Sequence, residues 1–218
     1  MDLTNIQELL DSQDYGDRLS GLNHLRKIPD QDSFRMILPL LKDVNARVRY
    51  GAVSQMDRLG YVDLDKSLDI LLDCLLNDSE TDVKAAAADA LGGLKLTAAF
   101  DDLKNTYENS SEWLLQFSII AALGEMGDPR SFNLLQSALS SPNELIRTAA
   151  ISSLGELGDP QAIPLLLKFE NDPDWQIRYR LAQALGNFQT QETQDVLQRL
   201  ALDPFEQVSL EAKHNLHK

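Results

Sequence analysis

The sequence predicts an all-α fold in which about seven helix pairs stack into one α-solenoid, an α-α superhelix. Three observations predict it: a hydrophobic column recurs along the whole chain, small polar residues that favour helix starts recur before it, and large apolar residues recur eight residues after it. Only 6% of the 218 residues are aromatic, whereas leucine and alanine are abundant. This composition favours helices that pack through aliphatic side chains over a β-sandwich.

The hydrophobic column marks the second helix of each pair. Its members are separated by 31, 35, 32, 31, 31 and 31 residues, a period too regular for chance. They are Asp17, Val48, Val83, Leu115, Ile146, Ile177 and Val208. Asp17 breaks the column, as suits an end repeat that faces water. The expected repeats are residues 1–29, 30–60, 61–95, 96–127, 128–158, 159–188 and 189–218, with no linker, so we expect a single domain over 1–218.

Other columns predict where the second helices begin and end. Five residues before the hydrophobic column every repeat carries a serine or an aspartate, which we expect to be the N-cap. These residues are Ser12, Asp43, Asp78, Ser110, Ser141, Asp172 and Asp203. We expect Pro142, Pro173 and Pro204 at the first helical position, and Gly92, Gly124, Gly155 and Gly186 where the helix closes. Pro39 and Pro164 should bend two of the first helices.

The face of the second helices that points away from the core carries the aromatic side chains. Both tryptophans lie on it, and each is followed four residues later by an aromatic partner on the same helix face: Trp113 by Phe117 and Trp175 by Tyr179. Tyr50 lies on the same face, and these aromatic side chains form a stripe along it. We expect the stripe to line the concave groove and to bind a planar, partly apolar ligand or a partner's apolar ridge. Packing between repeats is the alternative that the sequence leaves open.

A column of cations follows one residue after the hydrophobic column. Its members are Arg18, Arg49, Lys84, Arg147 and Arg178, and Arg180 lies beside Tyr179. In an acidic chain these cations attract carboxylates of a ligand or partner. The other interpretation, which the repeat pattern favours, is that the column braces neighbouring repeats against their acidic caps. The predicted binding groove is Tyr50, Trp113, Phe117, Trp175, Tyr179, Arg147, Arg178 and Arg180.

Charge and composition exclude several functions. The net charge of −14 and the lack of a basic run exclude nucleic acid as a partner, and no apolar run is long enough for membrane insertion. A single cysteine, Cys74, and the lack of a signal peptide fit a cytoplasmic protein. We expect Cys74 to be a small buried hydrophobe. No catalytic motif and no metal-ligand cluster are present, so we assign no catalytic residue, no metal and no cofactor.

The repeats resemble the phycobilin lyase HEAT-like family of cyanobacteria. The similarity runs over essentially the whole chain and rests most on "GGLKLTAAFDDL" (92–103) and "EWLLQFSIIAALGEMGDPR" (112–130). It implies a role in dismantling phycobilisomes, with phycobiliproteins of the phycocyanin type and other degradation factors as partners. It also implies that a bilin such as phycocyanobilin is bound, and is handled or detached by lyase-type chemistry. Whether the chain is an enzyme stays open, and the alternative is a non-catalytic adaptor that leaves the pigment untouched.

Overall fold

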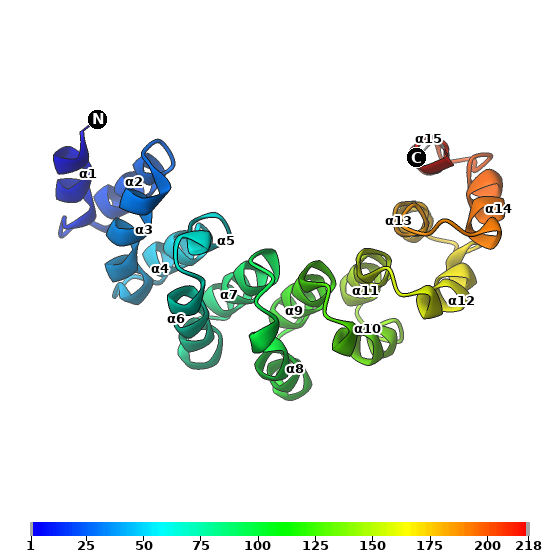
Figure 1. Ribbon diagram of the computed structural model, residues 1–218, viewed down its shortest axis with the longest axis horizontal. Helices are drawn as coiled ribbons and strands as arrows, with labels where there is room; N and C mark the ends of the chain where they lie inside the picture. Colours follow the sequence, from blue (N-terminus) through cyan, green and yellow to red (C-terminus); the bar gives the residue numbers. More distant parts are fainter. Residues whose placement is uncertain (1, 217–218) are drawn as a thin grey trace. The chain divides into compact units, whose positions relative to one another are not determined.

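The computed structural model describes residues 2–216, and every regular element among them is helical (Figure 1). The all-α prediction is therefore confirmed. Contacts divide the chain into two compact units, Met1–Ala122 and Leu123–Lys218. The boundary lies inside helix α9 (Trp113–Met126). The prediction of one uninterrupted domain over residues 1–218 stays a prediction.

The first unit consists of helix pairs that follow one another in chain order. The pairs are α1 (Leu3–Leu10) with α2 (Tyr15–Leu25), α3 (Asp30–Ile37) and η1 (Leu38–Lys42) with α4 (Ala46–Val53), and α6 (Leu64–Asn77) with α7 (Thr81–Gly93). The short helices α5 (Met56–Leu59) and η2 (Gly60–Val62) connect the second pair to the third, and η3 (Thr97–Ala99) and α8 (Phe100–Asn109) precede α9. The second helices α2, α4 and α7 pack against one another in succession (Figure 1).

The second unit repeats this arrangement. Its pairs are η4 (Pro129–Ser131) and α10 (Phe132–Ala138) with α11 (Glu144–Leu157), η5 (Pro160–Ala162), α12 (Ile163–Leu166) and η6 (Leu167–Phe169) with α13 (Trp175–Leu185), and α14 (Gln191–Leu200) with α15 (Glu206–Leu216). Helix α13 packs between α11 and α15. Pro39 and Pro164 lie in first helices that are part α-helix and part 3₁₀-helix, which is the expected local distortion.

The hydrophobic column forms the centre of the core in both units. From Val48 to Val208 none of its members is more than 4% exposed, and burial of each such side chain contributes about 1.5–3 kcal/mol. Asp17, the exception, is exposed and accepts a hydrogen bond from the Ser12 hydroxyl at 2.8 Å. The first repeat thus presents a polar residue where the inner repeats bury an aliphatic one, as the sequence predicts.

The second helices begin later than predicted. The true N-caps are residues two positions further on, among them Asp14, Asn45, Asn143 and Asp174, whose side chains accept from backbone amides of the first turn. The predicted Ser/Asp column lies in the preceding loop, where every member accepts the backbone N–H of the residue two positions ahead at 2.8–3.2 Å. The proline that follows the column in three repeats is therefore a loop residue.

Of the predicted helix-end glycines, Gly186 caps the C-terminus of α13 as predicted, whereas Gly92, Gly124 and Gly155 lie within the second helices and have a different role. A Cβ atom on Gly92 would lie 2.6 Å from the Cα of Ala122, and one on Gly155 would lie 2.6 Å from the Cα of Ala184. The missing side chain lets one second helix approach the backbone of the next. The glycines with left-handed backbone conformations are Gly127 and Gly158, with φ of 72° and 68°.

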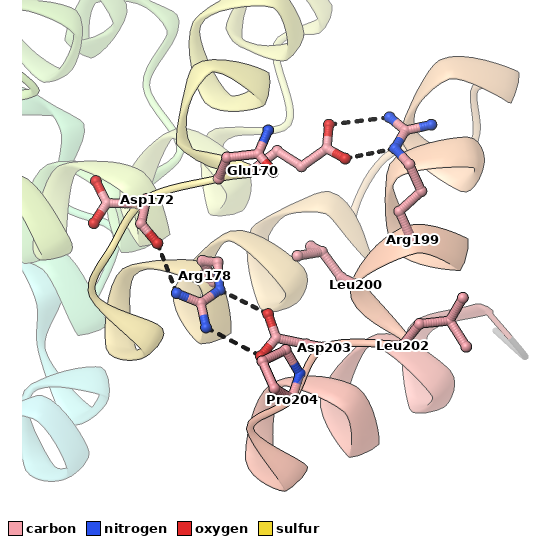
Figure 2. A pocket seen from close by; sticks show the side chains of 9 residues that line it. Glu170, Asp172, Arg178, Arg199, Leu200, Leu202, Asp203 and Pro204 are labelled. Carbon is pink, nitrogen blue, oxygen red and sulfur yellow. Dashed lines mark hydrogen bonds and ion pairs between the residues drawn. The ribbon is translucent and has the colours of Figure 1, made fainter.

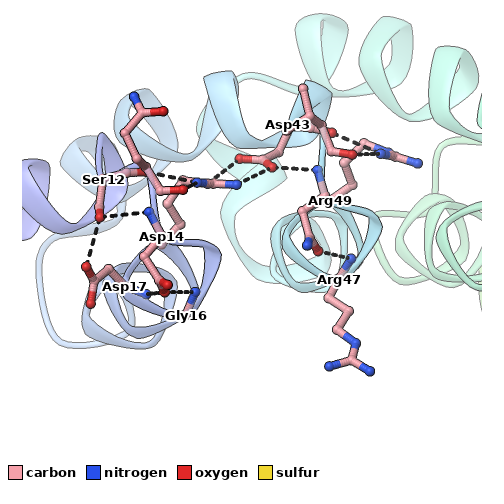
Figure 3. Close-up of polar contacts among 11 residues, drawn as sticks. Ser12, Asp14, Gly16, Asp17, Asp43, Arg47 and Arg49 are labelled. Carbon is pink, nitrogen blue, oxygen red and sulfur yellow. Dashed lines mark hydrogen bonds and ion pairs between the residues drawn. The ribbon is translucent and has the colours of Figure 1, made fainter.

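Arginine–aspartate ion pairs connect successive repeats of the first unit, and Figure 3 shows the polar contacts around one of the aspartates, Asp43. Arg18 donates from Nε and Nη2 to the carboxylate of Asp43 at 2.7 and 2.9 Å, and Arg49 does the same to Asp78 at 2.7 and 2.8 Å. The Nη1 group of each arginine donates to a loop carbonyl of its own repeat. We call this arrangement the inter-repeat clamp. It confirms the bracing interpretation for these two members of the cation column.

The second unit contains the same clamp between α13 and the loop before α15 (Figure 2). Arg178 donates from Nε and Nη2 to Asp203 at 2.6 and 3.0 Å, and the two side chains are only 10% and 6% exposed. The hydrogen bond from Arg178 lowers the pKa of Asp203, although burial opposes this effect. The carboxylate is therefore ionised in the folded protein under all but strongly acidic conditions.

We predict that Gly155→Ala lowers the free energy of unfolding by about 1–3 kcal/mol, because the added methyl group has no room beside Ala184. Helix propensity alone predicts the opposite, a gain of about 1 kcal/mol. Denaturant unfolding measures the difference. Gly127→Asn is the control, since its site is open and asparagine tolerates a positive φ. A stabilised Gly155→Ala variant would refute the close-approach interpretation.

We predict that Asp203→Asn costs about 3–5 kcal/mol at neutral pH, because it leaves Arg178 buried without its counter-charge. The pKa of Asp203 is lowered by folding, so its contribution is fully present above its ordinary pKa of 3.8 and is lost as the pH falls through the folded value. Urea unfolding of both proteins from pH 7 to pH 2 should show a difference that shrinks below about pH 4. A difference that is constant over this range would contradict the clamp.

Candidate functional site

The side chains predicted to line the groove fall into both units. Tyr50, Trp113 and Phe117 belong to the first unit, and the remaining five belong to the second. In the first unit, Tyr50 on α4 is 48% exposed and Trp113 on α9 is 49% exposed, while Phe117 is partly buried. Tyr15 on α2 is also exposed. These residues form an aromatic stripe on the second helices of the first unit.

The second unit has a pocket of about 360 Å³ on its second helices. We call it the groove pocket. Its lining residues are Glu144, Leu145 and Thr148 from α11, Trp175, Gln176, Tyr179 and Arg180 from α13, and Gln207 from α15. The structure thus brings Trp175, Tyr179 and Arg180 together, and all three come from the stripe or its immediate neighbour in the sequence.

The aromatic wall of the groove pocket is held in place by neighbouring side chains. The ring of Trp175 stacks on Phe205, with ring centroids 5.8 Å apart and an angle of 10° between the planes. The hydroxyl of Tyr179 accepts from the Gln183 side chain at 3.2 Å. Sequence analysis missed Phe205 because it lies three residues before the hydrophobic column, one position outside the stripe. The only indication in the sequence was that Phe205 is an aromatic residue next to a stripe position.

Arg180 supplies the basic edge of the groove pocket. Its guanidinium carbon lies 5.7 Å from the centre of the Tyr179 ring, and Nη1 donates to Gln183 at 2.8 Å. The side chain is exposed. It makes no ion pair among the residues that the structure describes, although its charge acts to lower the pKa of Glu156. An anionic group in the pocket can therefore pair directly with the guanidinium.

Glu144 supplies an acidic edge of the groove pocket. A hydrogen bond with Asp174 and the charge of that residue raise the pKa of Glu144, and Arg147 acts against this effect. The groove pocket therefore combines two aromatic rings, the Arg180 cation and the carboxyl group of Glu144, whose pKa responds to nearby charge.

Arg178 does not line the groove pocket, contrary to the predicted set. It is 8% exposed, and its clamp to Asp203 occupies the edge that would bind a ligand carboxylate. It lines a different cavity of about 340 Å³, which also contains the Arg199–Glu170 ion pair (Figure 2). Because both arginines of this cavity are paired, we assign it a structural role and remove Arg178 from the candidate ligand-binding residues.

Arg147 has a third kind of environment. Its Nη1 group donates to the carbonyl oxygens of Ser141 and Pro142 at 2.8 and 3.2 Å. Unlike Arg178, it makes no ion pair with any residue in the described part of the chain. The predicted site is thus divided: Arg178 braces the fold, Arg180 borders the pocket, and Arg147 is fixed by its own loop without a carboxylate partner.

No catalytic centre is recognisable within residues 2–216. Burial raises the pKa of the Cys74 thiol to about 11, so the side chain is a neutral thiol, in keeping with the predicted buried hydrophobe. No cluster of three metal-ligating side chains occurs in the same part of the chain. None of its helices is both long and apolar enough to span a bilayer.

Comparison with known proteins places this geometry among helical repeat proteins. Models of HEAT repeats match residues 4–92 and 100–172, and a further HEAT-repeat model matches residues 162–191. No curated protein matches the sequence significantly. The complex of CpcE and CpcF of phycocyanin lyase from Nostoc sp. PCC7120 is similar in structure, with a TM-score of 0.67 and 18% identity over 100% of this chain and 94% of that chain.

Two other solved structures share the fold. A HEAT-like repeats protein from the archaeon Thermococcus onnurineus NA1 has a TM-score of 0.59 and 15% identity over 100% of this chain and 96% of its own. An engineered protein has a TM-score of 0.61 and 17% identity over 99% of this chain and 67% of its own. At such identities these similarities establish the fold alone, whereas the repeat models match well over half of the sequence. The chain belongs to the HEAT-repeat family.

Proposed function

We propose that this chain is a phycobilisome degradation factor, similar to the protein NblB, that binds phycobiliproteins and handles or detaches their bilin chromophore. The observation that carries the proposal is the groove pocket, where Trp175 and Tyr179 lie beside the free guanidinium of Arg180. The similarity to the CpcE–CpcF complex along the whole chain supports it, as does the resemblance of residues 92–103 and 112–130 to phycobilin lyase relatives. A cytoplasmic location is part of the proposal.

The pocket suits one part of a bilin. A bilin is planar and conjugated and carries two propionates, so aromatic rings can stack on its faces and arginine can pair with its carboxylates. The volume of about 360 Å³ is near the lower end of the range of about 300–1,000 Å³ for ligand pockets. We therefore expect the pocket to hold one end of the chromophore while the rest lies along the second helices.

The proposal does not depend on turnover. Detachment by elimination requires a base that removes a proton from the carbon next to the C–S carbon while the cysteine thiolate leaves. We assign no residue of this chain to that base. Binding that distorts the chromophore would favour the elimination with a water molecule or hydroxide from solvent as the acceptor of that proton. A binding factor that accepts the loosened bilin is therefore the form of the proposal that fits the side chains of the pocket.

A protein adaptor without pigment chemistry is the second candidate. The exposed aromatic stripe of the first unit, with Tyr15, Tyr50 and Trp113, favours it because such side chains are enriched at protein interfaces. Cytosolic partners would include phycobiliproteins or other degradation factors. The two candidates differ in whether the chromophore itself is contacted.

We predict that free phycocyanobilin changes its visible absorption when the purified chain is added, because stacking on Trp175 alters the environment of the conjugated system. Titration with chromophore-loaded phycocyanin should also reduce its fluorescence. An unchanged bilin spectrum with co-migration of phycocyanin would leave only the adaptor. If neither probe responds, the link to phycobiliproteins is wrong.

We predict that Trp175→Ala weakens bilin binding at least about tenfold, equivalent to about 1.4 kcal/mol, because it removes the stacked wall of the pocket. The matched control is Trp113→Ala, which removes the other tryptophan from the first unit. The same absorption titration measures both variants, and circular dichroism verifies that their helix content is retained. Equal losses in the two variants would contradict the assignment of the bilin to the groove pocket.

A further inference from the structure

The arginines of the cation column are all held in the same way by their own repeat. In each, Nη1 donates to the backbone carbonyl of the residue six positions earlier, at 2.8 Å for Arg18, 2.9 Å for Arg49, 2.8 Å for Arg147 and 2.6 Å for Arg178. A second, longer contact to the following carbonyl accompanies each. These contacts fix the guanidinium and leave its Nε–Nη2 edge for a different partner.

Three of these arginines use that edge to hold an aspartate of the next repeat. The separation is 25 residues for Arg18–Asp43 and Arg178–Asp203, and 29 residues for Arg49–Asp78. The counterpart of Arg147 by position is Asp172, again 25 residues further on. Asp172 forms the usual turn by accepting the N–H of Asp174 at 2.9 Å, but no ion pair joins it to Arg147 among the described residues.

The open edge occurs at the junction where the groove pocket forms. Glu144, Leu145 and Thr148, which flank Arg147 on α11, all line that pocket. The same junction brings Glu144 together with Asp174 from the loop before α13. The junction of α11 and α13 therefore lacks the clamp found between α13 and α15. Arg147 makes no ion pair there among the described residues, and its charge acts to lower the pKa of the neighbouring Glu144.

We propose that Arg147 is a preformed receptor for a carboxylate brought by the ligand, bound through the Nε–Nη2 edge that its sister arginines use for aspartate. A carboxylate matches this edge with two parallel hydrogen bonds. The contacts of Nη1 already order the side chain, so less conformational entropy is lost on binding. This inference rests on the proposed function for the source of the carboxylate, which is a bilin propionate or an acidic side chain of the phycobiliprotein.

Unfolding experiments test whether the edge is open. The experiment compares two sets of variants, each made of two single variants and their double variant. One set is Arg147→Gln with Asp172→Asn, and the other is Arg178→Gln with Asp203→Asn. We expect the melting temperature to fall by about 10 °C for Arg178→Gln and by less than about 2 °C for Arg147→Gln. The changes in melting temperature caused by the substitutions at positions 147 and 172 should add in the double variant, whereas those at positions 178 and 203 should not. Strong coupling between positions 147 and 172 would mean that the clamp closes, and would overturn the proposal.

Binding experiments identify the source of the carboxylate. Free phycocyanobilin, its dimethyl ester and chromophore-loaded phycocyanin are titrated against the wild type and Arg147→Gln. A loss of about tenfold or more for free bilin, with no loss for the ester, identifies a propionate. A loss confined to phycocyanin identifies an acidic side chain. If the wild type binds these probes and Arg147→Gln binds all of them equally well, the proposal is wrong.

A third measurement separates this proposal from the proposed function. Sodium propionate is added to the wild type while the arginine Nε–H resonances are followed by NMR. We expect the Arg147 signal to shift and the Arg178 signal, whose edge is occupied by Asp203, to stay unchanged. This outcome would support the receptor even if bilin and phycocyanin both fail to bind. An unshifted Arg147 signal would overturn it.

Discussion

The structure depends on the close approach of successive second helices. A single helix pair cannot bury its apolar face alone, so each pair must pack on the next. Gly92 meets the backbone of Ala122, and Gly155 meets that of Ala184, at distances that admit no side chain. This approach buries the aliphatic column, and it places the outward-facing residues of neighbouring helices beside one another. The groove pocket on α11, α13 and α15 is a direct result.

The inter-repeat clamp complements this packing at the loops. Glycine and alanine set the distance between helices, while a guanidinium fixed by its own loop holds the carboxylate of the next one. Charges inside these clamps are neutralised within the fold and contribute little to recognition. Only cations outside a clamp can pair with a ligand. Arg180 and Arg147 are such cations, whereas Arg178 is paired with Asp203.

Much of the fold was predictable from the sequence because the same residue types recur at equivalent positions of successive repeats. The aliphatic column and the positions of the paired helices follow from spacing alone. The helix starts were placed too early because two positions that are two residues apart, such as Asp172 and Asp174, both carry residues that suit an N-cap. Gly92, Gly124 and Gly155 were interpreted as helix ends because a sequence gives no distance between neighbouring helices. For the same reason the stacking of Phe205 on Trp175 could not be seen, since it joins residues 30 positions apart.

The candidate site was predictable as a stripe but not as a set of partners. Trp175 and Tyr179 share a helix face by periodicity, and Arg180 follows Tyr179 directly in the sequence. Whether an arginine is paired depends on the next repeat's loop, so periodicity treats Arg147 and Arg178 alike although their surroundings differ. Such differences between equivalent positions arise from tertiary contacts and carry the functional information.

The clamp also limits where the repeats can vary in length. Every repeat has the same five-residue step from its Ser/Asp loop residue to the buried column, whereas the step from the column to the next loop residue is 26 residues in most repeats, 27 in one and 30 in another. The longest step contains two short helices, α5 and η2, between α4 and α6. One edge of the stack is thus fixed in length, and the opposite turns are the places where this chain has accepted insertions and where an engineered segment would disturb the stacking least.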